Sequence, residues 1–82
     1  MNAADDVSAR LSRGIERTFA LRPGSSGPDS GLGRTPHWDS LGHIELMLAL
    51  EAEFRVRIRS DVAASLRTFA QLREMLEQSL SR

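Results

Sequence analysis

The chain has 82 residues, and its 11 basic and 11 acidic side chains leave it with no formal net charge. A chain this short buries only about 60–65% of the surface that it exposes when unfolded, which leaves room for one thin core and argues against a deep enzyme pocket. The charge balance argues against a protein that binds nucleic acid or a membrane surface. Because Cys is absent, the chain itself offers no disulfide, no zinc site and no thiol nucleophile, and we predict no metal-binding residues.

The first residues are polar and acidic, without the apolar segment of a signal peptide, and no apolar run approaches the length of a membrane span. We therefore expect a monomeric cytoplasmic protein with a single domain over residues 1–82. Since the chain begins with Met1 and ends in a short tail, we expect a discrete protein and not part of a larger one.

Residues 5–21 predict an amphipathic helix, because their large apolar side chains recur at steps of four. These side chains are Val7, Leu11, Ile15 and Phe19. Residues 22–37 are dense in Gly, Pro and Ser, which predicts a long loop. Loops of this length are uncommon in compact domains and tend to be functional. Leu32 is the strongly apolar residue of the loop, and we expect it to plug the core.

A second helix is predicted from Asp39, a favourable N-cap residue, to about Phe54. Its apolar residues fall on two arcs about 120° apart. The predicted core arc consists of Leu46, Met47, Leu50 and Phe54. The second arc consists of Leu41, Ile44 and Leu48. The helix therefore has more apolar surface than one buried face needs, and the second arc is either extra core contact under the loop or an exposed patch for partners.

Residues 55–60 alternate with period two, but no other segment could pair with them as a strand. We expect an extended connector with Val56 and Ile58 pointing inward. The intervening side chains, Arg55, Arg57 and Arg59, should face water, because guanidinium groups are not buried without partners.

Residues 60–66 are expected to form a short helix with Val62 and Leu66 pointing inward. Thr68 then caps a last helix, whose apolar residues at helical spacing are Phe69, Leu72, Leu76 and Leu80. Together, these predicted elements indicate an all-α fold, a four-helix bundle of three longer helices and one short helix with a long first loop.

Ser40 stands at the start of the second predicted helix, beside Asp39. A hydrolase built from Ser40, His37 or His43 is disfavoured, because Asp39 is needed as the cap and no G-x-S-x-G elbow is present. By its helical angle His43 lies near the core arc, which favours a packing role. A Ser in a first helical turn is usually only structural. Here the long loop before it and the apolar arc beside it favour a functional Ser40.

The segment WDSLGHIELMLALEAEF resembles the acyl carrier protein signature, D-S-L followed by E-L and then L-E-x-E-F. The likeness continues through RIRSDVAASLRTFAQLREML and covers residues 32–78 well and the first helix loosely. It implies a non-catalytic four-helix carrier. Ser40, flanked by Asp39 and Leu41, matches the serine that receives 4′-phosphopantetheine from coenzyme A through a Mg²⁺-dependent phosphopantetheinyl transferase. The thiol of that arm would carry acyl groups as thioesters.

The sequence differs from fatty-acid carriers at two positions after Ser40, and these differences bear on which partner enzymes the protein uses. Gly42 stands where many of those carriers have an acidic residue, and His43 stands where Thr is common. Trp38 and the run DSLGH look more like freestanding carriers of polyketide or other secondary-metabolite pathways. The Gly-Gly pair frequent in peptidyl carriers is absent, although a peptidyl or aminoacyl carrier stays an alternative. The alternative of another class is a small helical interaction module without a prosthetic group.

The resemblance also implies a docking surface for the transferase and for an acyl-loading enzyme, an acyltransferase or a ketosynthase. The predicted partner-binding residues are Leu41, Ile44, Glu45, Leu48, Glu51, Arg55, Arg57 and Arg59. Glu45, Glu51 and Glu53 with Asp39 resemble the acidic docking face of the family. The three arginines stand where a typical fatty-acid carrier is acidic or neutral, so they either select partners or are a solvated run balanced by the glutamates.

Overall fold

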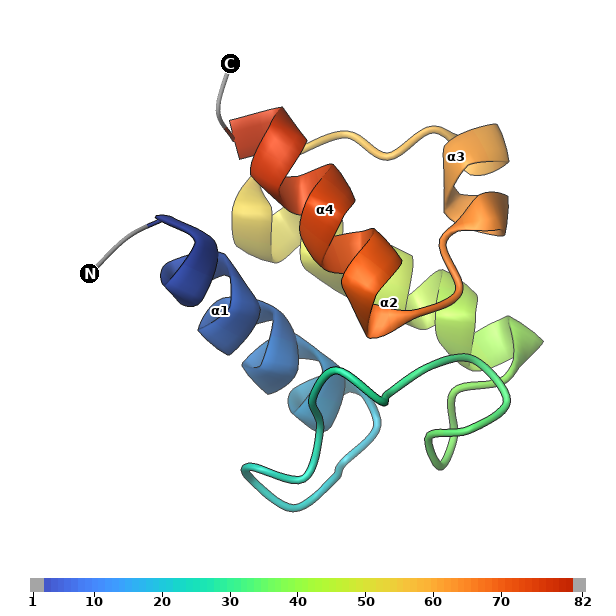
Figure 1. Ribbon diagram of the computed structural model, residues 1–82. Coiled ribbons are helices and arrows are strands. Elements are labelled where there is room, and N and C mark those ends of the chain that lie inside the picture. The colour runs from blue at the N-terminus through green and yellow to red at the C-terminus, as the bar shows by residue number, and fades with distance from the viewer. Residues whose placement is uncertain (1–2, 81–82) are drawn as a thin grey trace.

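The computed structural model describes residues 3–80 and has four helices in this range. They are α1 (Ala3–Thr18), α2 (Ser40–Phe54), α3 (Ser60–Ser65) and α4 (Phe69–Leu80). α1 packs against both α2 and α4, and the long loop after α1 crosses one end of the bundle (Figure 1). The all-α bundle of three longer helices and one short helix is therefore confirmed. The outermost residues of the predicted domain, 1–2 and 81–82, lie outside the described range.

The core lies where α1, α2 and α4 meet, and it is built from the apolar stripes that the sequence predicted. α1 contributes all four residues of its face, and α2 contributes its whole core arc. The fully buried members are Leu11, Ile15, Leu46, Leu50, Leu72 and Leu76 from the helices, and Trp38 from the loop before α2. No helix among residues 3–80 is long and apolar enough to cross a membrane.

α1 ends three residues before the sequence predicted, because the backbone turns into a Schellman motif there. Ala20 adopts the left-handed conformation with φ of 54°. The Ala20 N–H donates to the carbonyl of Arg17, and the Leu21 N–H donates to the carbonyl of Glu16. Phe19 is still buried at the turn, so the apolar stripe outlasts the helix by one residue.

The plug of the core under the long loop is Trp38 and not Leu32. The Trp38 side chain is only 1% exposed and belongs to the core. The Leu32 side chain is half-buried and packs on the surface of the core. Leu32 instead holds the loop by its backbone, since its N–H donates to the carbonyl of Arg67 at 2.8 Å. The Phe69 N–H donates to the carbonyl of Ser30. These two backbone hydrogen bonds hold the loop against the start of α4.

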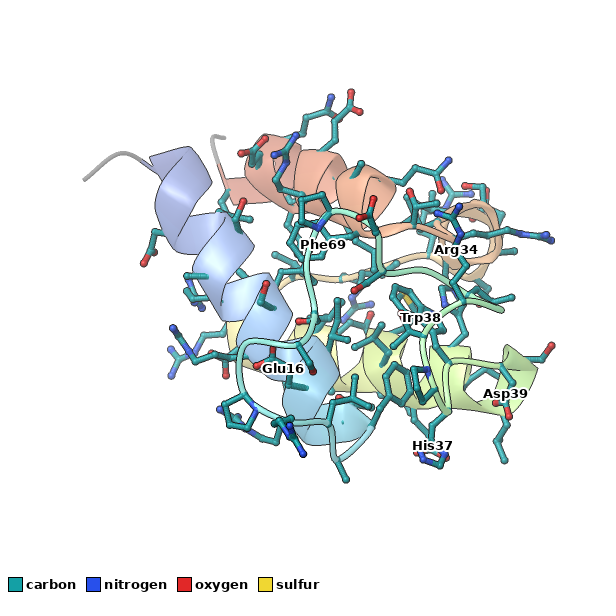
Figure 2. All side chains as sticks on the ribbon, turned by 60° about the horizontal axis from the view of Figure 1, so that its bottom comes forward. Glu16, Arg34, His37, Trp38, Asp39 and Phe69 are labelled. Atoms are coloured by element: carbon teal, nitrogen blue, oxygen red, sulfur yellow. The ribbon has the colours of Figure 1, made fainter. Side chains whose placement is uncertain are left out.

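A buried carboxylate anchors the other half of the loop. Glu16, on α1 beneath the loop, accepts hydrogen bonds from the hydroxyl of Ser26 at 2.7 Å and from its N–H at 3.0 Å (Figure 2). The Ser26 hydroxyl bond is the main reason that the pKa of Glu16 lies below its ordinary value, and it outweighs the opposing effect of burial. The Gly- and Ser-rich loop is thus tied to α1 by a charged acceptor.

The connector and α3 match their predicted positions with one correction. Val56 and Ile58 are half-buried against the core, and Leu66 is buried. Val62 is 37% exposed, so the expectation that it points inward is wrong. The reason is that α3 has only six residues and buries none of them. It is the residue after the helix, Leu66, that reaches the core.

α4 begins with the capping pair that a Thr in this position favours. The Thr68 hydroxyl accepts from the N–H of Gln71 at 3.2 Å, and the Gln71 amide oxygen accepts from the N–H of Thr68. The predicted cap is therefore confirmed. The apolar stripe of α4 is buried as far as Leu76, but Leu80, one turn later, is exposed and adds nothing to the core.

Candidate functional site

Ser40 is the first residue of α2, and its side chain is exposed. The turn that presents it is capped by Asp39, whose Oδ1 accepts a hydrogen bond from the N–H of Gly42 at 2.8 Å. The predicted N-cap is confirmed, and Asp39 is thereby committed to the helix end. Among residues 3–80 the Ser40 hydroxyl has no hydrogen-bond partner, so it is available to an external group.

Gly42 is required by the way the loop meets this first turn. A Cβ atom at this position would overlap the carbonyl oxygen of His37 and lie 2.9 Å from Cε1 of Phe19. His37 reaches this place through a left-handed backbone, with φ of 69°. The lack of a side chain at Gly42, the position where many fatty-acid carriers have an acid, is thus explained by the close approach of the loop.

His43 is buried in a hydrogen-bonded relay and not turned toward Ser40. Its Nδ1 accepts from Nε1 of Trp38 at 2.9 Å, and its Nε2 lies 2.8 Å from the carbonyl oxygen of Ala63. Because the indole can only donate, Nε2 carries the proton and donates to Ala63. The planes of the two rings differ by 13° and their centroids are 6.1 Å apart, so the rings meet edge to edge through the hydrogen bond between Nε1 and Nδ1. The predicted packing role of His43 is confirmed, and the relay ties α3 to the head of α2.

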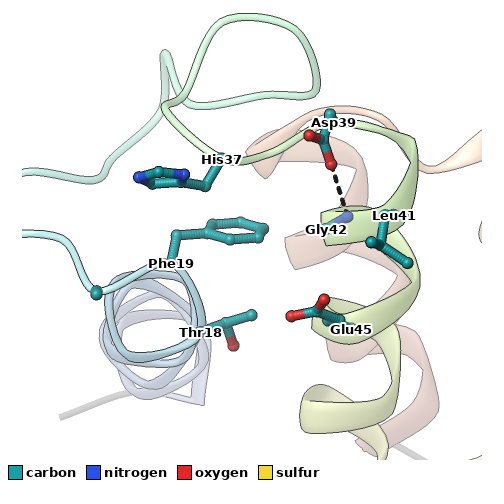
Figure 3. Close-up of a pocket in the computed structure, with 8 residues that line it drawn as sticks. Thr18, Phe19, His37, Asp39, Leu41, Gly42 and Glu45 are labelled. Atoms are coloured by element: carbon teal, nitrogen blue, oxygen red, sulfur yellow. Dashed lines mark hydrogen bonds between the residues drawn. The ribbon is translucent and has the colours of Figure 1, made fainter.

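The hydrolase interpretation fails on this geometry. Both nitrogens of His43 are engaged, and Asp39 caps the helix. His37 lies on the Phe19 side of the turn, with its ring above the ring of Phe19 (Figure 3). No residue within the described range forms the nucleophile–base hydrogen bond that a serine hydrolase requires of Ser40.

The sequence missed the importance of Trp38. It precedes the N-cap, and His43 is the fourth residue of the helix, so the pair occupies the two positions of a hydrophobic staple. Figure 2 shows Trp38 turned into the protein, while its neighbours His37 and Asp39 lie at the outer edge of the turn. An aromatic residue before the cap and a ring-bearing residue four places after the cap are the signal that could have predicted this contact.

The second apolar arc of α2 is exposed and starts beside Ser40. Leu41, Ile44 and Leu48 are 67%, 58% and 62% exposed. The interpretation of this arc as extra core contact is therefore wrong. We call these three residues the exposed stripe.

A hollow lies on each side of the exposed stripe. A groove of about 690 Å³ between α2 and α3 is lined by Ser40 and Ile44 on one side and by Ala63 and Arg67 on the other. A smaller pocket of about 380 Å³ lies toward the end of α1, where Thr18 and Phe19 face Glu45 (Figure 3). Ser40 and the exposed stripe thus lie between two hollows, where a partner protein can contact both.

The predicted acidic face is divided by the fold. Asp39 and Glu45 line the same pocket. Glu51 is half-buried, and its Oε2 accepts from the N–H of Ile58 at 2.7 Å. Glu53 lies toward α1, where its Oε1 is 3.8 Å from Nε of Arg10. Only Asp39 and Glu45 are therefore near Ser40, while the other two carboxylates hold neighbouring segments.

The three arginines of the connector are exposed, as the alternation predicted. Arg55 adopts the left-handed conformation that ends α2, with φ of 55°. Arg59 forms an exposed ion pair with Asp61 at 3.3 Å. Arg55 lies at the far end of α2 from Ser40. Arg59 is the N-cap residue of α3, between Ile58 and Ser60, which line the same groove as Ser40. The three arginines therefore extend from the end of α2 to the start of α3.

A comparison with known proteins identifies a relative over nearly the whole chain. The chain is 32% identical over 76 residues to the protein named Acyl carrier protein 2 of Pseudomonas aeruginosa. The alignment covers 93% of this chain and 96% of that relative, so it includes Ser40 and the helices around it. No protein-family model matches the chain, and no solved structure gives a significant match.

Proposed function

The chain belongs to the acyl carrier protein family, and from that premise we propose that Ser40 receives 4′-phosphopantetheine from coenzyme A. The protein is a carrier and not a catalyst, so the attachment would be made by a separate Mg²⁺-dependent phosphopantetheinyl transferase. The arm supplies the thiol that holds acyl groups as thioesters, and the chain has no Cys of its own for that purpose. In the transfer, the Ser40 oxygen loses its proton and forms the phosphodiester, while adenosine bisphosphate leaves.

The observation that carries this proposal is the exposed hydroxyl on a capped first turn. Ser40 is exposed, and Asp39 holds the turn that presents it. The N-terminus of a helix favours a phosphate, because the unpaired N–H groups and the helix dipole attract negative charge. The new phosphodiester would lie at this end of α2. Since Oδ1 of Asp39 is bonded to the Gly42 N–H, the cap does not compete for the Ser40 hydroxyl.

The exposed stripe supports docking of the transferase and of the enzymes that use the acyl group. Leu41, Ile44 and Leu48 are each more than half exposed and continue from Ser40 along α2. An exposed apolar patch of this kind marks a protein–protein contact. Glu45 lies beside the stripe and adds a negative charge within reach of a basic partner. The same surface can serve an acyl-loading enzyme, an acyltransferase or a ketosynthase in turn.

The groove between α2 and α3 supports protection of the cargo. Its apolar lining comes from Ile44, Met47, Leu48 and Ile58, and Ser40 stands at its edge. An acyl chain attached through Ser40 can lie against these side chains and be removed from water. The His43 bond to Ala63 holds α3 in place as the opposite wall.

The pathway we propose is polyketide or other secondary-metabolite biosynthesis, in the cytoplasm. The support is the local sequence around Ser40, where Trp38 and Gly42 depart from fatty-acid carriers. The fold adds a physical reason, since the loop packs on Gly42 and leaves no room for an acidic side chain there. A partner that needs a carboxylate two residues after the serine would not find it on this carrier.

Intact-protein mass spectrometry tests the attachment site. The unmodified chain is incubated with coenzyme A, Mg²⁺ and a promiscuous phosphopantetheinyl transferase. We expect one added phosphopantetheine on the wild type and none on Ser40→Ala. The exposed Ser25, on the loop, gives a matched control, and Ser25→Ala should be modified like the wild type. Modification of Ser40→Ala would move the site, and a folded wild type that stays unmodified would favour the interaction module.

A further inference from the structure

The connector after α2 carries a dense positive charge. Arg55, Arg57 and Arg59 are all exposed. Val56 and Ile58, between them, are half-buried against the core. Arg55 ends α2 in the left-handed conformation, and the connector from Val56 to Arg59 follows without helix or turn. In this connector the exposed Arg57 and Arg59 alternate with the half-buried Val56 and Ile58. We call these three arginines the arginine ridge.

A groove runs between the arginine ridge and the outer face of α4. It has a volume of about 570 Å³. Val56, Ile58 and Met75 supply its apolar surface, and all three arginines of the ridge line it. The groove therefore combines a partly apolar floor with a positively charged rim.

The neighbouring carboxylates do not neutralise the ridge. The Glu51 carboxylate accepts from the N–H of Ile58. The Glu53 carboxylate lies near Arg10 of α1, and a second nitrogen of Arg10 donates to the Glu53 carbonyl at 3.0 Å. Within the described part of the chain, Asp61 is the one carboxylate within 4 Å of a ridge guanidinium, that of Arg59. The charges of Arg55 and Arg57 are therefore left for an external group.

The groove is distinct from the hollows beside Ser40. Arg55, at one end of it, follows Ser40 by the whole length of α2, which at 1.5 Å per residue corresponds to about 22 Å along the helix axis. The connector then runs toward α3, and Ile58 lines both this groove and the α2–α3 groove, while the other residues that line it line neither hollow beside Ser40. A partner on the ridge would thus leave the exposed stripe and the Ser40 hydroxyl free.

From these observations we infer that the arginine ridge is a second docking site, which binds an acidic extended segment of a partner protein. Carboxylates of the segment meet the guanidinium groups, and apolar side chains between them enter the groove over Val56, Ile58 and Met75. The alternation of the ridge matches the period of two in an extended segment. Arginine is suited to this role, because its planar guanidinium pairs with a carboxylate through two parallel hydrogen bonds.

The chemistry of the groove favours such a segment over other anions. A nucleic acid or a lipid surface is drawn by a broad positive field, and this chain has no net charge. The apolar side chains of the groove make no favourable contact with a phosphate backbone, but they can bind apolar side chains of a peptide. A partner bound at the arginine ridge would stay on the carrier while another enzyme contacts the start of α2. The effective concentration of that partner near Ser40 would therefore be raised.

The test uses full-length Ser40→Ala, so that its outcome does not depend on the attachment of an arm. The probe is a short blocked peptide in which Glu and Val alternate, titrated into ¹⁵N-labelled protein at low salt. We expect amide shifts at residues 55–59 and around Met75, with no shift at residues 40–48. Binding should weaken as salt is added, because exposed charges are screened.

Charge reversal supplies the matched comparison. The triple variant Arg55→Glu, Arg57→Glu, Arg59→Glu should bind the probe at least about tenfold more weakly, since it loses three exposed ion pairs. The control triple Arg17→Glu, Arg22→Glu, Arg73→Glu changes the net charge equally at exposed positions outside the groove. It should bind the probe nearly as the parent does. Circular dichroism checks that both triples are folded.

Three further probes separate the possible ligands. A peptide that alternates Glu with Ser tests the apolar floor, and anionic vesicles and a single-stranded oligonucleotide test the other polyanions. Tighter binding of the Glu–Val peptide than of all three supports the inference. Equal binding of the Glu–Ser peptide, preference for vesicles or oligonucleotide, equal binding by the reversed triple, or no binding of the Glu–Val peptide would each overturn it.

Discussion

The two apolar faces of α2 carry similar side chains in opposite surroundings. Leu46 and Leu50 are fully buried in the core, whereas Leu41 and Leu48 are more than 60% exposed. All four are leucines on one helix, so apolar character alone does not distinguish a core position from a docking position. The angular position of each residue around the helix does, because neighbouring helices cover only one side.

The two faces also differ in what holds them. The buried face is fixed by packing along the helix. The exposed stripe has no packing of its own, and its place follows from the helix, whose head is held by the Asp39 cap, the close approach of His37 to Gly42 and the relay through His43. We conclude that substitutions on the first face should act on folding, and those on the second face should act on partners.

The largest loss of stability is expected from the buried face. Leu50→Ala removes a fully buried side chain and leaves a cavity between α1 and α2. It should lower the free energy of unfolding by about 2–5 kcal/mol, as core truncations of this kind do. Chemical denaturation followed by circular dichroism measures the change. A loss below about 1 kcal/mol would mean that the buried face is not the core of the fold.

A second, smaller loss of stability is expected from substitutions at Gly42, in the first turn of α2. Helix propensity alone would predict a gain of stability there. Gly42→Ala would ordinarily stabilise a helix by about 1 kcal/mol. Here the added Cβ overlaps the His37 carbonyl, and we expect a net loss of about 1–3 kcal/mol. Gly42→Asp, which introduces the acid of many fatty-acid carriers, should lose stability as well, although an acid near a helix N-terminus is normally favourable. A gain of stability in either variant would contradict the close approach of the loop.

The loop anchor should contribute less, and in a pH-dependent way. The pKa of Glu16 is lowered in the folded state, so its carboxylate adds stability above the unfolded-state pKa of about 4.3, and this stability is lost as pH falls through the folded value. Glu16→Gln keeps an acceptor for Ser26 but loses the charge. We expect it to be about 1 kcal/mol less stable than the wild type at pH 7. The difference should vanish in acid, and a constant difference across pH would exclude the charged anchor.

Much of this arrangement was predictable from sequence. The Asp39 cap, the two arcs of α2 and the outward arginines follow from periodicity and from capping preference, which are local properties. They place Ser40 at the head of a helix beside an apolar stripe. The capping role of Thr68 was predictable for the same reason.

The features that sequence missed depend on contacts between distant segments. The burial of Trp38 depends on the loop folding back over the core, and the need for Gly42 depends on the path of His37 and Phe19. Val62 was wrongly placed, because periodicity does not reveal that a helix as short as α3 buries none of its residues and packs Ala63, not Val62, against the core. The division of the acidic face likewise depends on where α1 and the connector lie.

The smallest stability change belongs to the exposed stripe, and it tests the division of α2 most directly. The free energy of unfolding and the initial rate of phosphopantetheine transfer are measured together for the wild type, Leu48→Ala and Leu50→Ala. Leu48→Ala should lose less than about 0.5 kcal/mol of stability, as surface changes do. Its transfer rate at limiting protein should fall by about fivefold or more, because a buried contact with the transferase is lost. The folded fraction of Leu50→Ala should be modified at the wild-type rate. A Leu48→Ala protein that is as unstable as Leu50→Ala, or that is modified as fast as the wild type, would contradict the account.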